Sequence, residues 1–273
     1  MIQSKTYRKL LVAVAAAVTA LALTAPAANA ATPAPGYTQF TGCPSQAEVP
    51  IVAFCQRVHI DGGHFKMGSK EVPIKNAMDL IGGLDSNGNF VGGVFPPVKQ
   101  TVPGGVVGLT GLTWLLELFG VEALSLHATT ELAGVPGNAF AEPIFLPIKV
   151  HLTTPSGVLG KNCYVGSVTN PIKLNLILGT TSPPPPNEPI TGVEPVASED
   201  LELGIIHLDN GQFVDNSFAA PGASGCVLTL FGFIPISING LVNSQSGLPA
   251  AAGTNETRQN FDIEFTSEEL VYP

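Results

Sequence analysis

The sequence predicts an all-β protein made of two duplicated β-sandwich-like units with long apolar connections. Three observations predict this class: short segments rich in β-forming residues, Asn-Gly turns between apolar runs, and similar motifs that recur in one order. Only 12% of the 273 residues are charged, which is far too few for a coiled coil or another long-helix protein.

The duplication is predicted from pairs of similar segments. The pairs are 57–60 with 149–152, 67–75 with 165–173, 84–91 with 208–214 and, more weakly, 128–132 with 266–270. Because the pairs keep the same order along the chain, chance is a poor explanation for them. We therefore expect a β unit A at 41–136 and a β unit B at 140–273.

Unit B contains an additional segment. Four consecutive prolines, 183–186, lie where the spacing of its motifs widens. Proline lacks the N–H that a sheet ladder needs and favours an extended polyproline conformation. We therefore expect a Pro-rich insertion near 179–200 that acts as a surface spacer, with a docking segment for a partner as the alternative.

The expected strands are short segments of β-forming residues, and several of them alternate apolar and polar residues. They are 58–60, 63–67, 74–80, 121–129, 144–152, 172–178, 201–208 and 261–265. Asn87-Gly88 and Asn210-Gly211 lie between apolar runs, as the turns of β-hairpins do.

One short helix is expected near 112–119, where an apolar segment ends at Gly120. Its counterpart in the second half, 227–234, is equally apolar. Both segments are expected to fill a core or the junction between the units. The alternatives are a lid over an apolar cavity and an exposed contact patch.

The N-terminus predicts export. Residues 1–30 combine a basic start, an apolar stretch at 10–23 and small residues at Ala28 and Ala30, which is the pattern of a cleaved signal peptide. An uncleaved membrane anchor is the alternative, but the apolar stretch is short for a span. We expect residues 31–40 to be a flexible leader and no transmembrane span after cleavage.

The four cysteines, Cys43, Cys55, Cys163 and Cys226, predict two disulfides in an exported chain. Three pairings are possible. We favour Cys43–Cys55 and Cys163–Cys226, because each bond then lies within one half of the chain. A zinc site is the alternative, but it needs closely spaced Cys or His pairs that this chain lacks.

Two segments are candidate metal sites, although a plain turn is the favoured interpretation of each. His59, Asp61 and His64 place two imidazoles and a carboxylate close together in sequence; a polar hairpin explains them as well. Asp85, Asn87 and Asn89 occupy the first positions of a calcium loop, but Pro96 stands where its essential Glu belongs. Asn255 begins a formal glycosylation sequon, Asn-Glu-Thr.

Several segments of the second half, 162–167, 170–172, 218–226 and 247–255, resemble exported actinobacterial proteins of unassigned function. The resemblance implies an extracellular or cell-surface setting and no catalytic residues. It also supports the Cys163–Cys226 pairing, because both cysteines lie in the resembling segments.

The function we expect is that of a secreted, non-catalytic extracellular or cell-surface protein. It would be structural, or would bind an apolar ligand, a protein partner or a component of the cell envelope, and it would need no cofactor. A formal net charge of −9 excludes a typical nucleic-acid binder. The alternative is a secreted hydrolase whose site, with His59, Asp61 and His64, lies between the two units.

Overall fold

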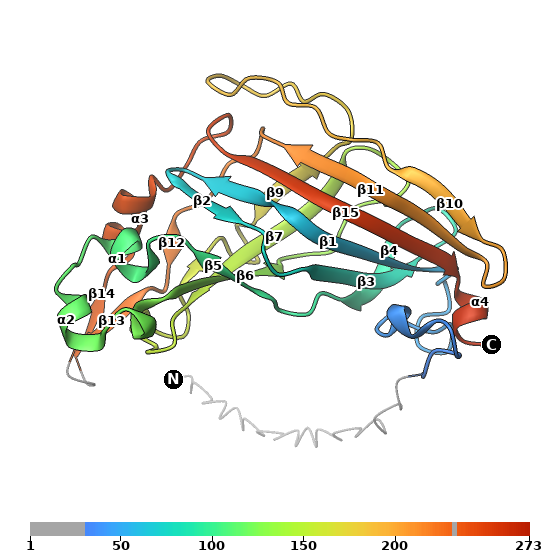
Figure 1. The fold of residues 1–273 in the computed structure, drawn as a ribbon, viewed down its shortest axis with the longest axis horizontal. Coiled ribbons are helices and arrows are strands. Elements are labelled where there is room, and N and C mark those ends of the chain that lie inside the picture. The colour runs from blue at the N-terminus through green and yellow to red at the C-terminus, as the bar shows by residue number, and fades with distance from the viewer. Residues whose placement is uncertain (1–30, 231–233) are drawn as a thin grey trace, which may run out of the picture. The chain divides into compact units, whose positions relative to one another are not determined.

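A computed structural model describes residues 31–230 and 234–273, and Ala31–Pro273 form one compact unit. The expected signal peptide, 1–30, lies outside the described residues. Strand residues far outnumber helical ones, at 42% against 12%, so the all-β prediction is confirmed. Most strands belong to two antiparallel sheets whose apolar faces share one core (Figure 1).

The seven-stranded sheet has the order β10-β11-β15-β1-β3-β4, and β2 also pairs with β1. Its strands are β1 Phe54–Met67, β2 Lys70–Pro73, β3 Met78–Leu84, β4 Phe90–Val94, β10 Val196–Asp200, β11 Ile205–Asp215 and β15 Glu256–Ser267.

The six-stranded sheet has the order β12-β8-β7-β6-β5, and β9 also pairs with β7. Its strands are β5 Lys99–Val102, β6 Leu126–Leu132, β7 Ile144–Thr153, β8 Tyr164–Val165, β9 Ile172–Leu176 and β12 Ala223–Ser224. A separate hairpin joins β13 Val227–Leu230 to β14 Ile234–Ser237.

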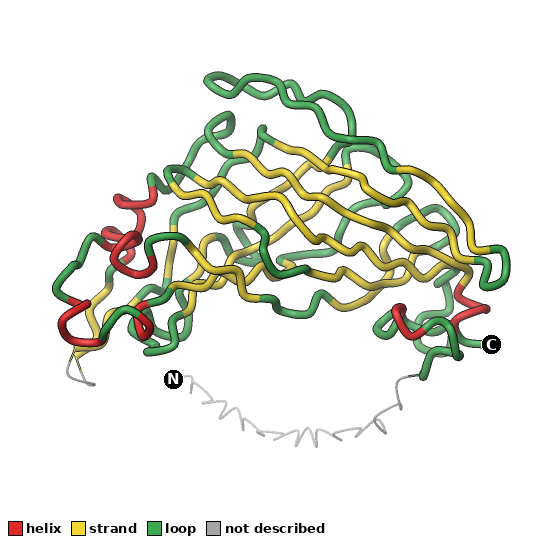
Figure 2. The backbone as a smooth tube through the Cα atoms, in the orientation of Figure 1, coloured by secondary structure: helices red, strands yellow, loops and turns green. Residues whose placement is uncertain are grey.

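Helices are short and lie at the ends of the sheets (Figure 2). They are η1 Thr38–Phe40, α1 Gly105–Thr110, α2 Leu115–Phe119, η2 Glu122–Leu124, α3 Asn239–Ser246 and α4 Glu268–Val271. The helix expected near 112–119 is therefore present as α2, and it ends at Gly120, whose φ of 76° suits glycine. Its expected counterpart at 227–234 starts with strand β13 instead.

The expected boundaries 41–136 and 140–273 do not separate two independent sandwiches. Instead, β1 pairs along its length with β15, and β6 pairs with β7, so strands of both ranges share each sheet. The 14 residues of β1 pair with the 12 of β15 on one edge and with the shorter β3 and β2 on the other.

The two exchanged pairs nevertheless resemble each other. Arg57 of β1 lies opposite Glu264 of β15, and Lys149 of β7 lies opposite Glu131 of β6. Their charged atoms are 3.4 Å and 2.9 Å apart, respectively. The matched segments do not all occupy like elements, however, because 84–91 spans the turn from β3 to β4 whereas 208–214 lies within β11. The duplication therefore stays a prediction.

The segment 31–40 is not a loose leader. Phe40 is fully buried and Tyr37 is 8% exposed, in a small second core with Cys55, Ile205 and Val271. The Tyr37 hydroxyl donates a hydrogen bond of 2.8 Å to the Leu203 carbonyl. Burial of two aromatic rings outweighs the flexibility that the Pro and Gly residues of this segment suggest.

Both favoured disulfides are present, Cys43–Cys55 and Cys163–Cys226. The first links the N-terminal segment to β1, and the second links the segment before β8 to the segment before β13. Paired cysteines of this kind fit a protein that folds in an oxidising compartment.

Two expected turns are strand irregularities instead. Residues 59–64 do not form a hairpin, because β1 continues through them with a bulge beside Gly62. Asn210-Gly211 is not a hairpin turn either, because β11 continues with a bulge at this point. Asn210 has a φ of 59°, a left-handed conformation that Asn tolerates and that bulges often use.

Candidate functional site

The main candidate site is a cavity of about 180 Å³ between the two sheets. Val58, Ile60 and Ile263 line it from the seven-stranded sheet. Leu132, Leu146 and Leu176 line it from the six-stranded sheet. These side chains point inward because alternate residues of a strand face one side of its sheet.

Phe140 lies where the cavity meets solvent. Its side chain is 55% exposed, whereas the other described lining residues are buried or half-buried. Its ring centroid is 6.2 Å from that of Phe54 and 6.4 Å from that of Phe265. The loop between β6 and β7, which carries Phe140, therefore covers the end of the cavity with an aromatic cluster.

Two glutamines interrupt the apolar lining. Gln56 of β1 is 7% exposed and Gln259 of β15 is 1% exposed. Gln259 Nε2 donates a hydrogen bond of 3.3 Å to Thr257 Oγ1. Within the described part of the chain, the side chain of Gln56 makes no hydrogen bond, and its amide is not among the fully buried unpaired groups, so it is accessible from the cavity that it lines.

The described walls of this cavity carry none of the side chains that usually act in catalysis. Among the described residues that line it, none is charged, and none carries a hydroxyl, a thiol or an imidazole. The arrangement can therefore enclose an apolar molecule and donate or accept hydrogen bonds through amides. It offers no nucleophile or general base from its own walls.

The histidines predicted as metal ligands lie on the opposite, outer face of the seven-stranded sheet. His59 Nδ1 is 2.8 Å from Asp79 Oδ1, and Arg57 Nε is also 2.8 Å from that oxygen. Burial would raise the pKa of Asp79, but hydrogen bonds from His59 and Arg57 outweigh it, so this pKa lies below its usual value. The cluster is a half-exposed cross-strand ion network.

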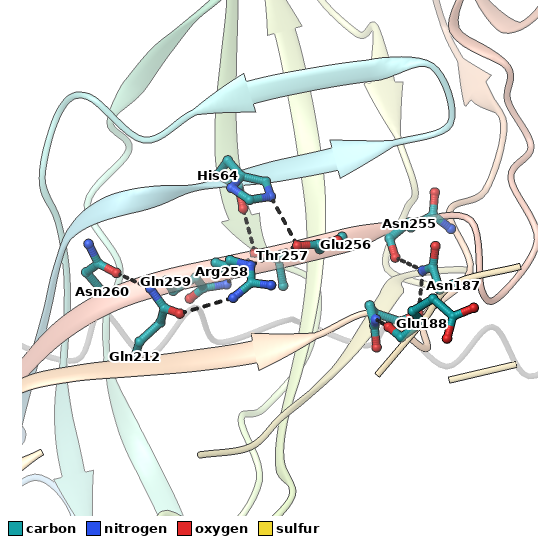
Figure 3. Close-up of polar contacts among 11 residues, drawn as sticks. His64, Asn187, Glu188, Gln212, Asn255, Glu256, Thr257, Arg258, Gln259 and Asn260 are labelled. Atoms are coloured by element: carbon teal, nitrogen blue, oxygen red, sulfur yellow. Dashed lines mark hydrogen bonds and ion pairs between the residues drawn. The ribbon is translucent and has the colours of Figure 1, made fainter. Parts of the chain in front are cut away.

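His64 belongs to a different network further along the same face (Figure 3). Its Nε2 is 3.6 Å from Glu256 Oε1, and that carboxylate also accepts a hydrogen bond of 2.9 Å from Arg258 Nε. Asp61 is exposed at the bulge of β1. His59, Asp61 and His64 are thus not brought together, and the described residues contain no cluster of three metal-ligating side chains.

Asp85 closes the turn between β3 and β4. Its Oδ1 accepts hydrogen bonds from the Asn87 and Asn89 amides at 2.8 Å and 2.9 Å, and its Oδ2 accepts one from Asn89 Nδ2. The bonds from Asn89 and Asn87 lower the pKa of Asp85. The carboxylate is therefore occupied within its own turn, which agrees with the hairpin interpretation and gives no support to calcium.

The sequon asparagine is fully buried. Asn255 Nδ2 donates hydrogen bonds to the carbonyls of Phe218 and Ala251, and its Oδ1 accepts one from Gly68 N. Both amide hydrogens are used, so Asn255 serves as an internal connector of three loops in the folded protein.

Comparison with known proteins adds no identification. No family model, no curated protein and no solved structure matches this chain. Within residues 31–230 and 234–273, no helix has the length and hydropathy needed to cross a membrane.

Sequence reasoning missed the cavity, although its signal is visible afterwards. In β1 the inward positions read Gln56, Val58 and Ile60, so a polar residue occupies the apolar face. In β15 Gln259 precedes inward Phe261 and Ile263. A buried polar residue in an otherwise apolar alternation is a recognisable sign of a functional position.

Proposed function

We propose that this protein is an exported, non-catalytic binding protein that holds a small apolar molecule between its two sheets. The observation that carries this proposal is the cavity of about 180 Å³ with an apolar lining. A cavity of ~150 Å³ with a similar lining is large enough to take up benzene.

The chemistry of the walls favours binding over hydrolysis. A hydrolase between the halves of the chain needs a nucleophile or an activated water near a base. The side chains considered for that role, His59 and His64, are engaged by carboxylates on the outer face of the sheet. The described lining of the cavity provides apolar contact and two amides only.

An extracellular or cell-surface location is part of the proposal. The two disulfides support an oxidising environment. The resemblance of the second half to exported actinobacterial proteins and the pattern of residues 1–30 support the same location.

The test is titration with N-phenyl-1-naphthylamine, an uncharged fluorophore that brightens in apolar surroundings. We expect saturable binding of one molecule per chain. Leu146→Trp should fill the cavity and weaken binding at least tenfold. The control Leu270→Trp, at a side chain that is 43% exposed on α4, should bind like the wild type.

Both variants need circular dichroism and thermal melting, and Ile263→Phe is a milder filling variant if Leu146→Trp fails to fold. Equal loss in Leu270→Trp, or unchanged binding in folded cavity-filling variants, would refute the proposal. The second result would place the fluorophore on exposed apolar side chains such as Trp114 and Phe119 of the α2 region.

A further inference from the structure

The inference starts from the unpaired amide of Gln56. This side chain is more than nine-tenths buried, lines the apolar cavity and has no hydrogen-bond partner in the part of the chain that the structure describes. Its amide is accessible from the cavity rather than fully buried, so a bound molecule can form hydrogen bonds with it. By contrast, buried Gln100 on β5 accepts bonds from the amides of Lys75 and Asn76 and donates one to the Asn76 carbonyl.

The position of Gln56 tells which end of a ligand it would meet. Gln56 lies opposite Phe265 in the β1–β15 register, and Phe265 packs against Phe140 at the exposed end of the cavity. Gln259, six residues along β15, also lines the cavity, roughly 20 Å from Phe265 at the usual rise per residue. The cavity thus has one amide near its mouth, Gln56, and a second, Gln259, further along β15, with apolar side chains such as Ile263 between them.

The absence of charge restricts the polar group of the ligand. None of the described lining residues is cationic or anionic. A carboxylate or an ammonium group buried here would lose its hydration without gaining an opposite charge. A neutral group that donates or accepts hydrogen bonds would satisfy the amide of Gln56 at little cost.

We propose, resting on the binding function above, that the ligand is a single-chain apolar molecule with a neutral hydrogen-bonding head, such as a hydroxyl or carbonyl group. Gln56 pairs with that head at the mouth, and the hydrocarbon chain lies between the sheets toward Gln259. Gln56 is in this view the residue that determines specificity for the head group.

The test is displacement of N-phenyl-1-naphthylamine by 1-octanol, by octanoate at neutral pH and by naphthalene as a pure hydrocarbon. In the wild type we expect 1-octanol to compete and octanoate to fail at concentrations where 1-octanol saturates. Gln56→Leu keeps the size of the side chain and removes the amide. It should weaken 1-octanol about threefold to tenfold and leave naphthalene unchanged or tighter.

Gln212→Leu is the matched control. Gln212 lies on the outer face of β11, where it is bonded to Asn260 and Arg258 (Figure 3). This variant should keep all wild-type affinities. Octanoate that binds as tightly as 1-octanol, or an unchanged preference for 1-octanol in Gln56→Leu, would overturn the head-group assignment while leaving apolar binding intact. Failure of all three competitors and of the fluorophore would overturn the binding function as well.

Discussion

Replacing Asn255 by Ala should destabilise the protein more than any exposed polar substitution. Asn255 is fully buried, and its side chain connects the β1–β2 turn at Gly68 to the carbonyls of Phe218 and Ala251. The three bonds measure 2.9, 2.8 and 3.0 Å, so all of them have good geometry.

The magnitude follows from these contacts. Each hydrogen bond contributes ~1 kcal/mol net, and a buried partner left unpaired costs a further ~1–3 kcal/mol. Asn255→Ala removes three bonds and leaves Gly68 N and two carbonyls without this partner. We therefore expect the free energy of unfolding to fall by about 3–5 kcal/mol.

Asn138 offers a control with the same chemistry in a solvent-exposed setting. Its side chain donates to the Asn87 carbonyl and to Asn89 Oδ1, and it accepts a bond from Phe140 N. Water can replace these partners, so Asn138→Ala should cost no more than ~1.5 kcal/mol. Urea unfolding of both variants, followed by circular dichroism, measures the difference. Equal losses would refute the argument that burial makes the Asn255 bonds important.

Two further predictions concern the disulfides and pH. Replacing both cysteines of Cys163–Cys226, which spans 63 residues, should lower the free energy of unfolding by about 4 kcal/mol. Replacing those of Cys43–Cys55, which spans 12, should lower it by about 3 kcal/mol. Urea midpoints in the reverse order would contradict the chain-entropy argument. Burial raises the pKa of Asp215 above 3.8, against the bonds from two backbone amides, so the folded state holds this proton more tightly than the unfolded state. The free energy of unfolding of the wild type, compared with that of Asp215→Asn, should therefore fall as pH rises from 3.8 through the raised pKa. If the difference between these two free energies stays constant or increases over this pH range, the carboxyl group of Asp215 is not desolvated.

The strand chemistry of the sequence was a sound guide to the class of fold and to several local features. Alternation in 172–178 predicted β9, and the Asn87-Gly88 turn joins β3 to β4 as expected. These features depend on residues that are close in the chain, where side-chain periodicity and turn chemistry decide the conformation. The disulfide preference also agreed with the structure, because it placed each bond within one half of the chain.

Long-range pairing was not predictable in this way. The exchange of β15 and β6 between the expected units depends on which faces of the strands can be buried together, and several pairings satisfy the same alternation. His59, Asp61 and His64 looked like one site because they are near in sequence. The pleat and the bulge of β1 instead place them in separate surroundings on the outer face.

By itself, the sequence determined that the chain forms strands, which cysteines are present to be paired and that the net charge is acidic. Only the tertiary structure decided that Gln56 and Gln259 face a common apolar cavity, because they are about two hundred residues apart in the chain and their strands come together only through the β1–β15 pairing. A cavity is a property of the space between packed faces. Its volume depends on side chains from both sheets together, and no single segment of sequence contains that information.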